Sequence, residues 1–139
     1  MTLFQSIDPA TEDTVWEGEA ASPDQVQAAV DRARAAFEPW ADRPRTERIE
    51  AVKRYQAVLN ARTPQMAEAI SRETGKPLWE TTAELGSMVG KVDISIRAYE
   101  ERTGERAGDT AFGRAVLRHR PHGVAAVLGP FNFPGHLPN

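Results

Sequence analysis

The chain has 139 residues, of which 40% are hydrophobic and 27% are charged, a composition that is ordinary for a globular domain and argues against disorder. Its formal net charge of −3 argues against a general nucleic-acid or anionic-membrane surface. Met1 to Ala10 has no basic region and no hydrophobic run, so no signal peptide is expected and a cytoplasmic protein fits. The sequence has no cysteine, which removes any disulfide framework.

The first part of the chain predicts a hairpin followed by two helices. Phe4 to Gly18 is expected to form the hairpin, with a turn at Asp8-Pro9-Ala10-Thr11. Ser22-Pro23-Asp24-Gln25 combines an N-cap serine, a proline at the first helical position and a glutamine, so a helix should begin there and end at Pro39. A second helix is predicted from about Arg45 to Asn60. Apolar residues repeat along one face of each helix: Val26, Ala29, Val30, Ala33 and Phe37 in the first, and Ile49, Val52, Tyr55 and Leu59 in the second.

Two more helices are predicted in the central part of the chain. Thr63-Pro64 has the pattern of a cap followed by proline and opens a short helix that Gly75 stops. The longest helix starts at Pro77 and continues to Gly104. Its apolar face contains Leu85, Met88, Val89, Val92, Ile96 and Tyr99. The segment from Arg72 to Pro77, RETGKP, is interpreted as a helix stop and turn, because Gly75 and Pro77 already explain it by backbone geometry.

A polar segment rich in glycine separates the longest helix from the last part of the chain. Residues 103–113 are predicted to form a loop, and residues 115–120 an extended strand. Arg118 and Arg120 then share a face and could contact an anionic carboxylate or a partner subunit, although solvated strand ends are the favoured explanation. His119 and His122 point to opposite faces of such a strand, and no cysteine completes a ligand set, so no metal site is expected.

The last stretch, GVAAVLGPFNFPGHLPN, predicts a strand, a loop and the start of a helix. Val124 to Leu128 is short, apolar and bounded by Gly123 and Gly129, which favours a strand that is buried on both faces of a parallel sheet. Pro134 suits the first position of a helix. Asn132 would then lie in the loop at the carboxyl end of the strand, where open α/β sheets bind their ligands.

This stretch resembles the oxyanion-loop segment of the aldehyde dehydrogenase superfamily. In the family pattern a strand is followed by proline, an aromatic residue, asparagine, a second aromatic residue and proline. Residues 130–134, PFNFP, match this pattern. DPATEDTVWEG near the start and RETGKP agree with the resemblance, and GHLPN is most similar to succinylglutamate-semialdehyde dehydrogenases. The resemblance covers essentially the whole chain but only about the first third of the family's length, so a fragment is expected.

The resemblance implies a cysteine thiolate that attacks an aldehyde, transfer of hydride to NAD or NADP, and hydrolysis of the thioester by a water that a glutamate activates. The cysteine and the glutamate would lie beyond Asn139, so the fragment alone is expected to be inactive. Asn132 would donate its amide to the oxygen of the tetrahedral intermediate; an amide is a neutral donor that needs no pKa adjustment. Leu128, Gly129, Pro130 and Phe131 would bind the cofactor. The alternative role of Asn132 is that of a plain turn residue.

The expected fold is α/β: a helical layer beside the first strand of a nucleotide-binding domain. By the resemblance, residues 1–113 form the helical part of the cofactor-binding domain, residues 114–122 a strand of the oligomerisation element, and residues 123–139 the first buried strand and the oxyanion loop. The implied reaction is oxidation of N-succinylglutamate 5-semialdehyde to N-succinylglutamate in arginine catabolism, by a homo-oligomer that binds neither nucleic acid nor membrane.

Three alternatives stay open. They are a semialdehyde dehydrogenase of other specificity, a stand-alone helical interaction module, and a different α/β nucleotide-binding enzyme. The last would be favoured by a phosphate loop, but the turn from Gly129 to Pro134 has neither the G-x-G-x-x-G pattern nor a Walker lysine.

Overall fold

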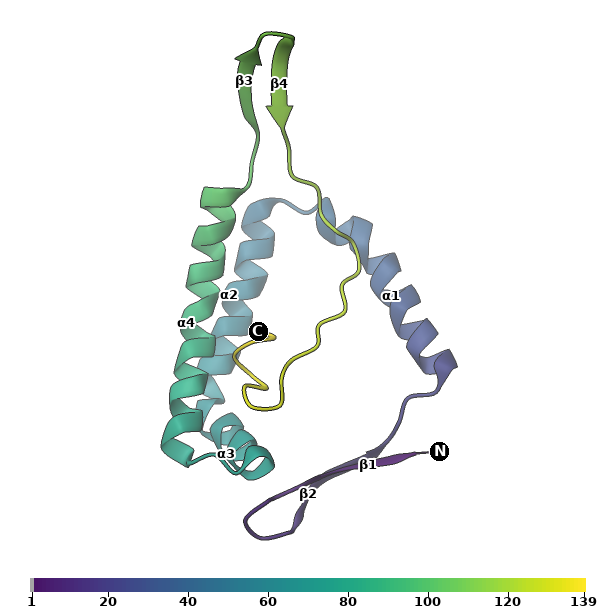
Figure 1. Ribbon diagram of the computed structural model, residues 1–139, viewed down its shortest axis with the longest axis vertical. Coiled ribbons are helices and arrows are strands. Elements are labelled where there is room, and N and C mark those ends of the chain that lie inside the picture. Colours follow the sequence, from purple (N-terminus) through teal and green to yellow (C-terminus); the bar gives the residue numbers. More distant parts are fainter. Residues whose placement is uncertain (1) are drawn as a thin grey trace.

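The computed structural model describes residues 2–139, which form four helices and two antiparallel hairpins (Figure 1). The elements in chain order are β1 (Leu3–Ile7), β2 (Thr14–Glu19), α1 (Pro23–Ala41), α2 (Arg45–Ala61), α3 (Thr63–Thr74), α4 (Leu78–Arg102), β3 (Arg106–Thr110) and β4 (Gly113–Leu117). The α/β class and the helical layer are therefore confirmed. No described helix has the length and apolar character needed to cross a membrane.

The core lies where α2, α3 and α4 meet. Helices α2 and α4 run side by side, and α3 packs across one end of them (Figure 1). The buried apolar side chains of this cluster are Leu59, Ala67, Ile70, Leu85 and Met88. Leu85, Met88 and Val92 are buried from one face of α4, as the helical repeat predicts. Each such side chain stabilises the fold by about 1.5–3 kcal/mol relative to an exposed one.

Two helix ends follow from their capping residues. The Ser22 hydroxyl accepts a hydrogen bond from the Gln25 amide at 3.2 Å, and the Gln25 side chain accepts one from the Ser22 amide at 2.7 Å, so the predicted capping box forms. Gly75 ends α3 with a left-handed φ of 72°, a conformation that glycine adopts without a steric penalty.

Two predicted helix ends were wrong. Pro39 lies inside α1, which continues to Ala41. A proline in the last turn removes a single intrahelical hydrogen bond, so the helix can end two residues later. Thr63 is the first residue of α3 and caps nothing; its hydroxyl donates to the Leu59 carbonyl at 3.1 Å. The turn between α2 and α3 is so tight that Arg62 both ends one helix and precedes the next.

Helix α1 has the predicted apolar face but buries no residue. Val26 and Val30 on that face are largely exposed. The last part of the chain runs between α1 and the pair formed by α2 and α4 (Figure 1), and α1 meets it near Gly123, beside the Arg34 side chain. An amphipathic pattern thus predicts the helix correctly, but burial also requires a surface that packs against it.

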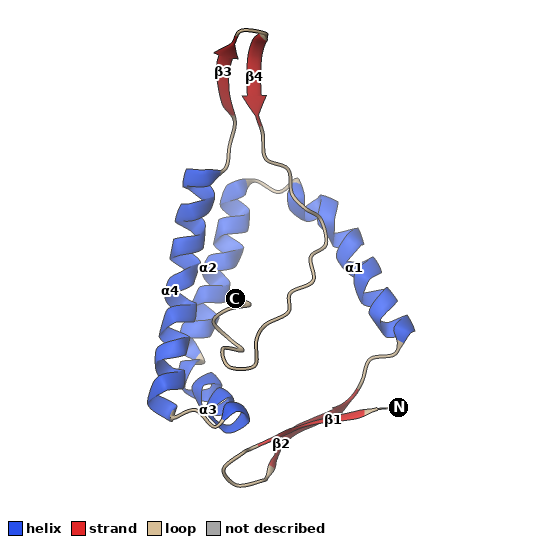
Figure 2. Ribbon diagram, viewed as in Figure 1, coloured by secondary structure: helices blue, strands red, loops and turns tan. Residues whose placement is uncertain are grey.

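The two hairpins lie at opposite ends of the molecule (Figure 2). The predicted N-terminal hairpin is confirmed: β1 pairs with β2, and the turn is closed by the buried Asp8, whose carboxylate accepts the Ala10 amide at 2.9 Å. The predicted loop over residues 103–113 is wrong in part, because β3 forms there and pairs with β4. Both strands are exposed along their whole length, so cross-strand hydrogen bonds and not an apolar pattern account for them.

The predicted strand from Val124 to Leu128 and the predicted helix from Pro134 do not form. Residues 124–128 have no strand pairing, and residues 131–138 form turns (Figure 2). A strand requires hydrogen-bonding neighbours, and within residues 2–139 the strands pair only inside the two hairpins. The apolar run is therefore unpaired.

Candidate functional site

The last seventeen residues divide into two parts, which we name the apolar half, residues 123–131, and the docked half, residues 132–139. The apolar half holds the four residues expected to bind cofactor. Leu128 and Phe131 expose 95% and 88% of their surfaces. Gly129 lies against the Pro138 ring, since a Cβ at this position would come within 2.9 Å of its Cγ atom. The Pro130 carbonyl accepts the Phe133 amide at 3.4 Å and closes the turn.

Asn132 begins the docked half and is exposed. Its backbone carbonyl accepts a hydrogen bond from the Lys76 ammonium at 3.3 Å. Its side-chain amide makes no hydrogen bond to any part of residues 2–139. The backbone of Asn132 is therefore tied to the helical layer, while the amide is available to a ligand.

The docked half is held on α4 by Glu84. One carboxylate oxygen of Glu84 accepts hydrogen bonds from the backbone amides of Gly135 and His136, each at 3.1 Å. These amides follow Pro134 in a turn, so the carboxylate satisfies donors that no backbone carbonyl meets, as a side chain does at a helix N-terminus. The Glu84 side chain is only 1% exposed. Its charge therefore requires compensation inside the protein.

Lys76 supplies this compensation. Its ammonium lies 2.9 Å from the second carboxylate oxygen of Glu84 and 3.3 Å from Glu80. It also lies 4.1 Å from the centre of the Phe133 ring, a cation–π distance. One lysine thus joins the turn after α3, the buried carboxylate of α4 and both residues at the start of the docked half.

The pKa values of this pair are shifted in the directions that stabilise two charges. Burial works to raise the pKa of Glu84, but the hydrogen bonds from Lys76, His136 and Gly135 outweigh it, and the pKa lies below its ordinary value. Burial works to lower the pKa of Lys76, but hydrogen bonds to Glu84 and Glu80 outweigh it, and the pKa is raised. Both groups are charged at neutral pH.

Asn139 and Lys91 fasten the end of the docked half. The Asn139 amide donates to the Met88 carbonyl at 3.1 Å, and its oxygen accepts from the Tyr55 hydroxyl at 2.6 Å. The Lys91 ammonium donates to the His136 carbonyl at 2.8 Å. The start of the docked half is therefore bonded to the turn between α3 and α4, and its end is bonded to α2 and α4.

Gly135 allows this close approach. A Cβ at this position would lie 2.5 Å from the Met88 sulfur and 3.3 Å from the Ile70 Cδ1 atom. Any larger residue would therefore require the docked half or the buried Met88 side chain to shift.

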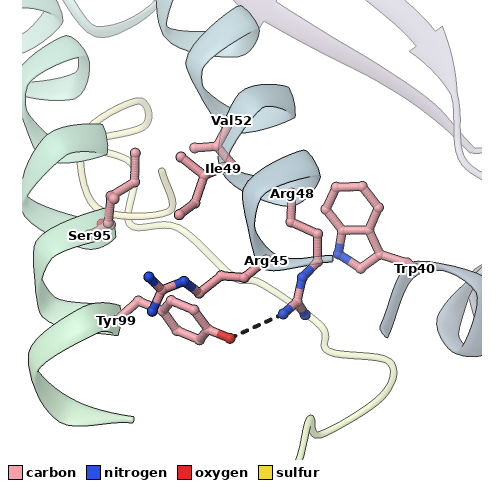
Figure 3. A pocket seen from close by; sticks show the side chains of 8 residues that line it. Trp40, Arg45, Arg48, Ile49, Val52, Ser95 and Tyr99 are labelled. Atoms are coloured by element: carbon pink, nitrogen blue, oxygen red, sulfur yellow. Dashed lines mark hydrogen bonds between the residues drawn. The ribbon is translucent and has the colours of Figure 1, made fainter. Parts of the chain in front are cut away.

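A separate cavity of about 240 Å³ lies between α2 and α4 (Figure 3). No residue of the last seventeen lines it; its lining residues are Trp40, Arg45, Arg48, Ile49, Val52, Ser95, Ile96 and Tyr99. Arg48 donates to the Tyr99 hydroxyl at 3.1 Å, and Arg45 pairs with Glu100. Both guanidinium groups therefore already have partners within the chain.

Two of the basic residues after β4 are also engaged locally. Arg118 pairs with Glu105 at 2.7 Å, and the His119 ring nitrogen lies 3.1 Å from the Gly104 carbonyl. Over residues 2–139 no three histidine, aspartate or glutamate side chains gather as a metal site would require.

The roles of Glu84 and Lys76 were not predicted from the sequence. A signal for Glu84 was present: it follows Thr81 by three residues and precedes Met88 by four, so an acidic residue lies on the apolar face of a helix. Such a residue needs a buried partner. At Lys76 the sequence predicts only a turn. The neighbouring Gly75 and Pro77 explain the backbone of this turn but not the lysine side chain.

A family model decides what the chain is. The model described as the aldehyde dehydrogenase family matches residues 1–139, the whole chain. The chain belongs to the aldehyde dehydrogenase family. The resemblance carried by PFNFP and RETGKP is thereby confirmed.

Similar sequences within this dehydrogenase family share one description. An N-succinylglutamate 5-semialdehyde dehydrogenase of Caulobacter sp. (strain K31) is 67% identical over 134 residues, which are 96% of this chain and 28% of that protein. A protein of the same description from Chromohalobacter salexigens is 57% identical over 98% of this chain and 28% of its own length. The chain thus spans 28% of the length of these curated relatives.

Solved structures of aldehyde dehydrogenases contain the same fold. NADP-dependent glyceraldehyde-3-phosphate dehydrogenase from Bacillus halodurans C-125, complexed with NADP, matches 98% of this chain and 30% of its own with a TM-score of 0.89 at 22% identity. A putative methylmalonate-semialdehyde dehydrogenase from Sinorhizobium meliloti 1021, complexed with NAD, matches 99% of this chain and 28% of its own with a TM-score of 0.87 at 25% identity. The arrangement of helices and hairpins is therefore that of the family.

Proposed function

We propose that this chain supplies the oxyanion donor, Asn132, for the oxidation of an aldehyde to a carboxylate with NAD or NADP. The observation that supports the proposal is the environment of Asn132. Its backbone is tied to α4 through Lys76, the residues after it are bonded to Glu84, and its amide has no partner among residues 2–139. A donor that is held in place before the substrate arrives stabilises developing charge without reorganisation.

The proposed substrate is N-succinylglutamate 5-semialdehyde, and the product is N-succinylglutamate. Support comes from the relatives that carry this description at 57–67% identity over nearly the whole chain. Arginine catabolism and a cytoplasmic location stay predictions that go with this substrate.

The proposed cofactor is NAD, with NADP as the alternative, and residues 128–131 would bind it. These residues fit such a group, because Leu128 and Phe131 present exposed apolar side chains and can pack against a flat ring. When bound, the cofactor accepts the hydride. The apolar side chains of this chain would pack against a ring of the cofactor and exclude water from it.

The proposed assembly is a homo-oligomer. The β3–β4 hairpin extends away from the helical layer (Figure 1), and the proposed oligomerisation element, residues 114–122, comprises most of β4 and the segment after it. A projecting hairpin with both strands exposed offers free edges that a second copy can pair with.

In this mechanism Asn132 acts on the carbonyl oxygen of the substrate. The oxygen gains negative charge as a thiolate attacks the carbonyl carbon, and the neutral amide donates a hydrogen bond to it. The interaction is stronger in the transition state than in the ground state, so its loss lowers kcat more than it raises KM.

The test uses a chimeric enzyme in which this chain replaces the matching residues of the Caulobacter sp. (strain K31) relative. Asn132→Ala should lower kcat for the semialdehyde by about 10² to 10³, the usual cost of removing one oxyanion donor. Asn132→Asp should be at least as harmful, because it keeps the size but places an acceptor and a negative charge against the oxyanion.

The matched control is Asn60→Ala at the exposed end of α2, which should leave kcat unchanged. If both Asn132 variants fold, bind cofactor and turn over like the parent, Asn132 is only a turn residue. A chimera that folds but oxidises no semialdehyde would contradict the proposed activity.

A further inference from the structure

We infer that Glu84, with Lys76 as its counter-ion, is the positioning residue that holds the Asn132 loop in its catalytic place. This inference rests on the proposed role of Asn132. It concerns a carboxylate on α4, which the resemblance did not single out.

The docked half has no strand or helix of its own, so no backbone ladder fixes it. Glu84 makes two hydrogen bonds to it, at Gly135 and His136, three and four residues after Asn132. Hydrogen bonds to a charged acceptor are stronger than neutral ones, and two on one oxygen restrict both position and orientation. The place of the turn relative to α4 thus depends on this carboxylate.

The support that Glu84 provides is rigid. Glu84 projects from the N-terminal third of the longest helix, between Thr81 and Leu85, which are both fully buried. Its other oxygen is bonded to Lys76 at 2.9 Å. A side chain that is fixed on both oxygens inside a packed core cannot follow the loop if the loop moves.

Lys76 also contacts Asn132 directly. The Lys76 ammonium donates to the Asn132 carbonyl and lies over the Phe133 ring. It therefore neutralises Glu84 and also bonds to the residue that carries the catalytic amide. Loss of the carboxylate would leave Lys76 free to turn toward Glu80, which is partly exposed, and would release both contacts at once.

Function should be sensitive to this support because oxyanion donors act over a short distance. A misplacement of about 1 Å, caused by a change remote from the reaction, can lower a rate about a hundredfold. Glu84 touches neither substrate nor cofactor in this account. Its effect should pass through Asn132 alone.

The first experiment is a double-mutant cycle in the chimeric enzyme described above. Glu84→Gln keeps the size and one acceptor oxygen but removes the charge, and we expect kcat to fall about ten- to a hundredfold with little change in KM. In the Asn132→Ala background the same substitution should change kcat less than about twofold, since the group that it positions is gone. The matched control, Glu68→Gln on the exposed face of α3, should have no effect in either background.

The second experiment needs no activity. In the parent protein, hydrogen exchange at the Gly135 and His136 amides should be slow, and Glu84→Gln should speed it about tenfold or more, while amides in the middle of α4 keep their rates. Lys76→Met should reproduce the change at these two amides, because it leaves the carboxylate without its counter-ion.

The outcomes separate the two proposals. If Asn132→Ala leaves kcat unchanged, the oxyanion role is wrong, and the exchange experiment still decides whether Glu84 holds the loop. If Asn132→Ala lowers kcat but Glu84→Gln has no effect, or has the same effect in both backgrounds, the positioning inference is overturned. Unchanged exchange at Gly135 and His136 in Glu84→Gln would also overturn it.

Discussion

The two halves of the last seventeen residues differ in a way that their hydrophobicity does not predict. The apolar half contains VAAVL and Phe131 but packs against little, and Val127, Leu128 and Phe131 all expose more than half of their surfaces. The docked half is more polar in its contacts and is fixed by charged and backbone hydrogen bonds to α4. Hydrophobicity favours burial only where another surface is present, whereas a few specific polar contacts can hold a segment that has no regular structure.

The largest effect should come from the core that supports the docked half. Leu85 is 0% exposed and lies next to Glu84 on α4. Leu85→Ala should lower the free energy of unfolding by about 2–5 kcal/mol, through lost apolar burial and the cavity left behind. Chemical denaturation of the parent and the variant measures this difference, and a change below about 1 kcal/mol would show that this core is not tightly packed.

A smaller effect is expected from the contact that seats the docked half. Gly135→Ala should force the turn away from Met88 and Ile70 and cost about 1–3 kcal/mol, as overpacking does. Gly86→Ala is the control with the same chemical change: it lies on the exposed side of α4, and a Cβ there meets nothing within 4 Å. It should raise stability by about 0.5–1 kcal/mol, because alanine favours a helix over glycine. Equal effects of the two substitutions in denaturation experiments would refute the close approach at Gly135.

The docked half should also respond to pH, and the sign follows from the directions of the two shifts. The lowered pKa of Glu84 makes its contribution fully present above the ordinary value of 4.5 and lost as the pH falls through the lowered value. The raised pKa of Lys76 makes its contribution present below 10.5 and lost as the pH rises through the raised value.

The difference in unfolding free energy between the parent and Glu84→Gln should therefore be constant from about pH 4.5 to about pH 10.5. It should shrink in stronger acid and in stronger base. A difference that grows as the pH falls below 4.5 would mean that Glu84 is more stable protonated, against this account.

The smallest effect is expected in the apolar half. Leu128→Ala should change the unfolding free energy by no more than about 0.5 kcal/mol, since the side chain makes few contacts in the chain. Binding of a hydrophobic dye and the tendency to associate should nevertheless decrease, because exposed apolar area is removed. A loss of stability close to that of Leu85→Ala would show that the apolar half is packed in solution.

Helices α2 to α4 could be predicted because their information is local. The apolar repeat of α4 depends only on residues that are close in sequence, namely Leu85, Met88 and Val92. The same is true of the left-handed glycine, Gly75, that ends α3. The position of Asn132 in a turn was predictable for the same reason. Strand β3 was missed because its residues are polar and exposed, so only pairing with β4 defines it.

The remaining features depend on contacts between distant segments. Whether Val124 to Leu128 forms a strand depends on neighbouring strands, which no local pattern reveals. The bonds from Glu84 to Gly135 and His136 span more than fifty positions, and Lys76 reaches Asn132 over a similar separation. Sequence alone showed an acidic residue on an apolar face, but only the fold shows which backbone amides it meets.

The most direct test of the account is a comparison of amide hydrogen exchange between the two halves in the same protein at neutral pH. Slow exchange at Gly135 and His136, with fast exchange at residues 125–128, is the predicted result, because only the docked half is bonded to a buried carboxylate. Equal rates in the two halves would contradict the claim that Glu84 holds the Asn132 loop on α4.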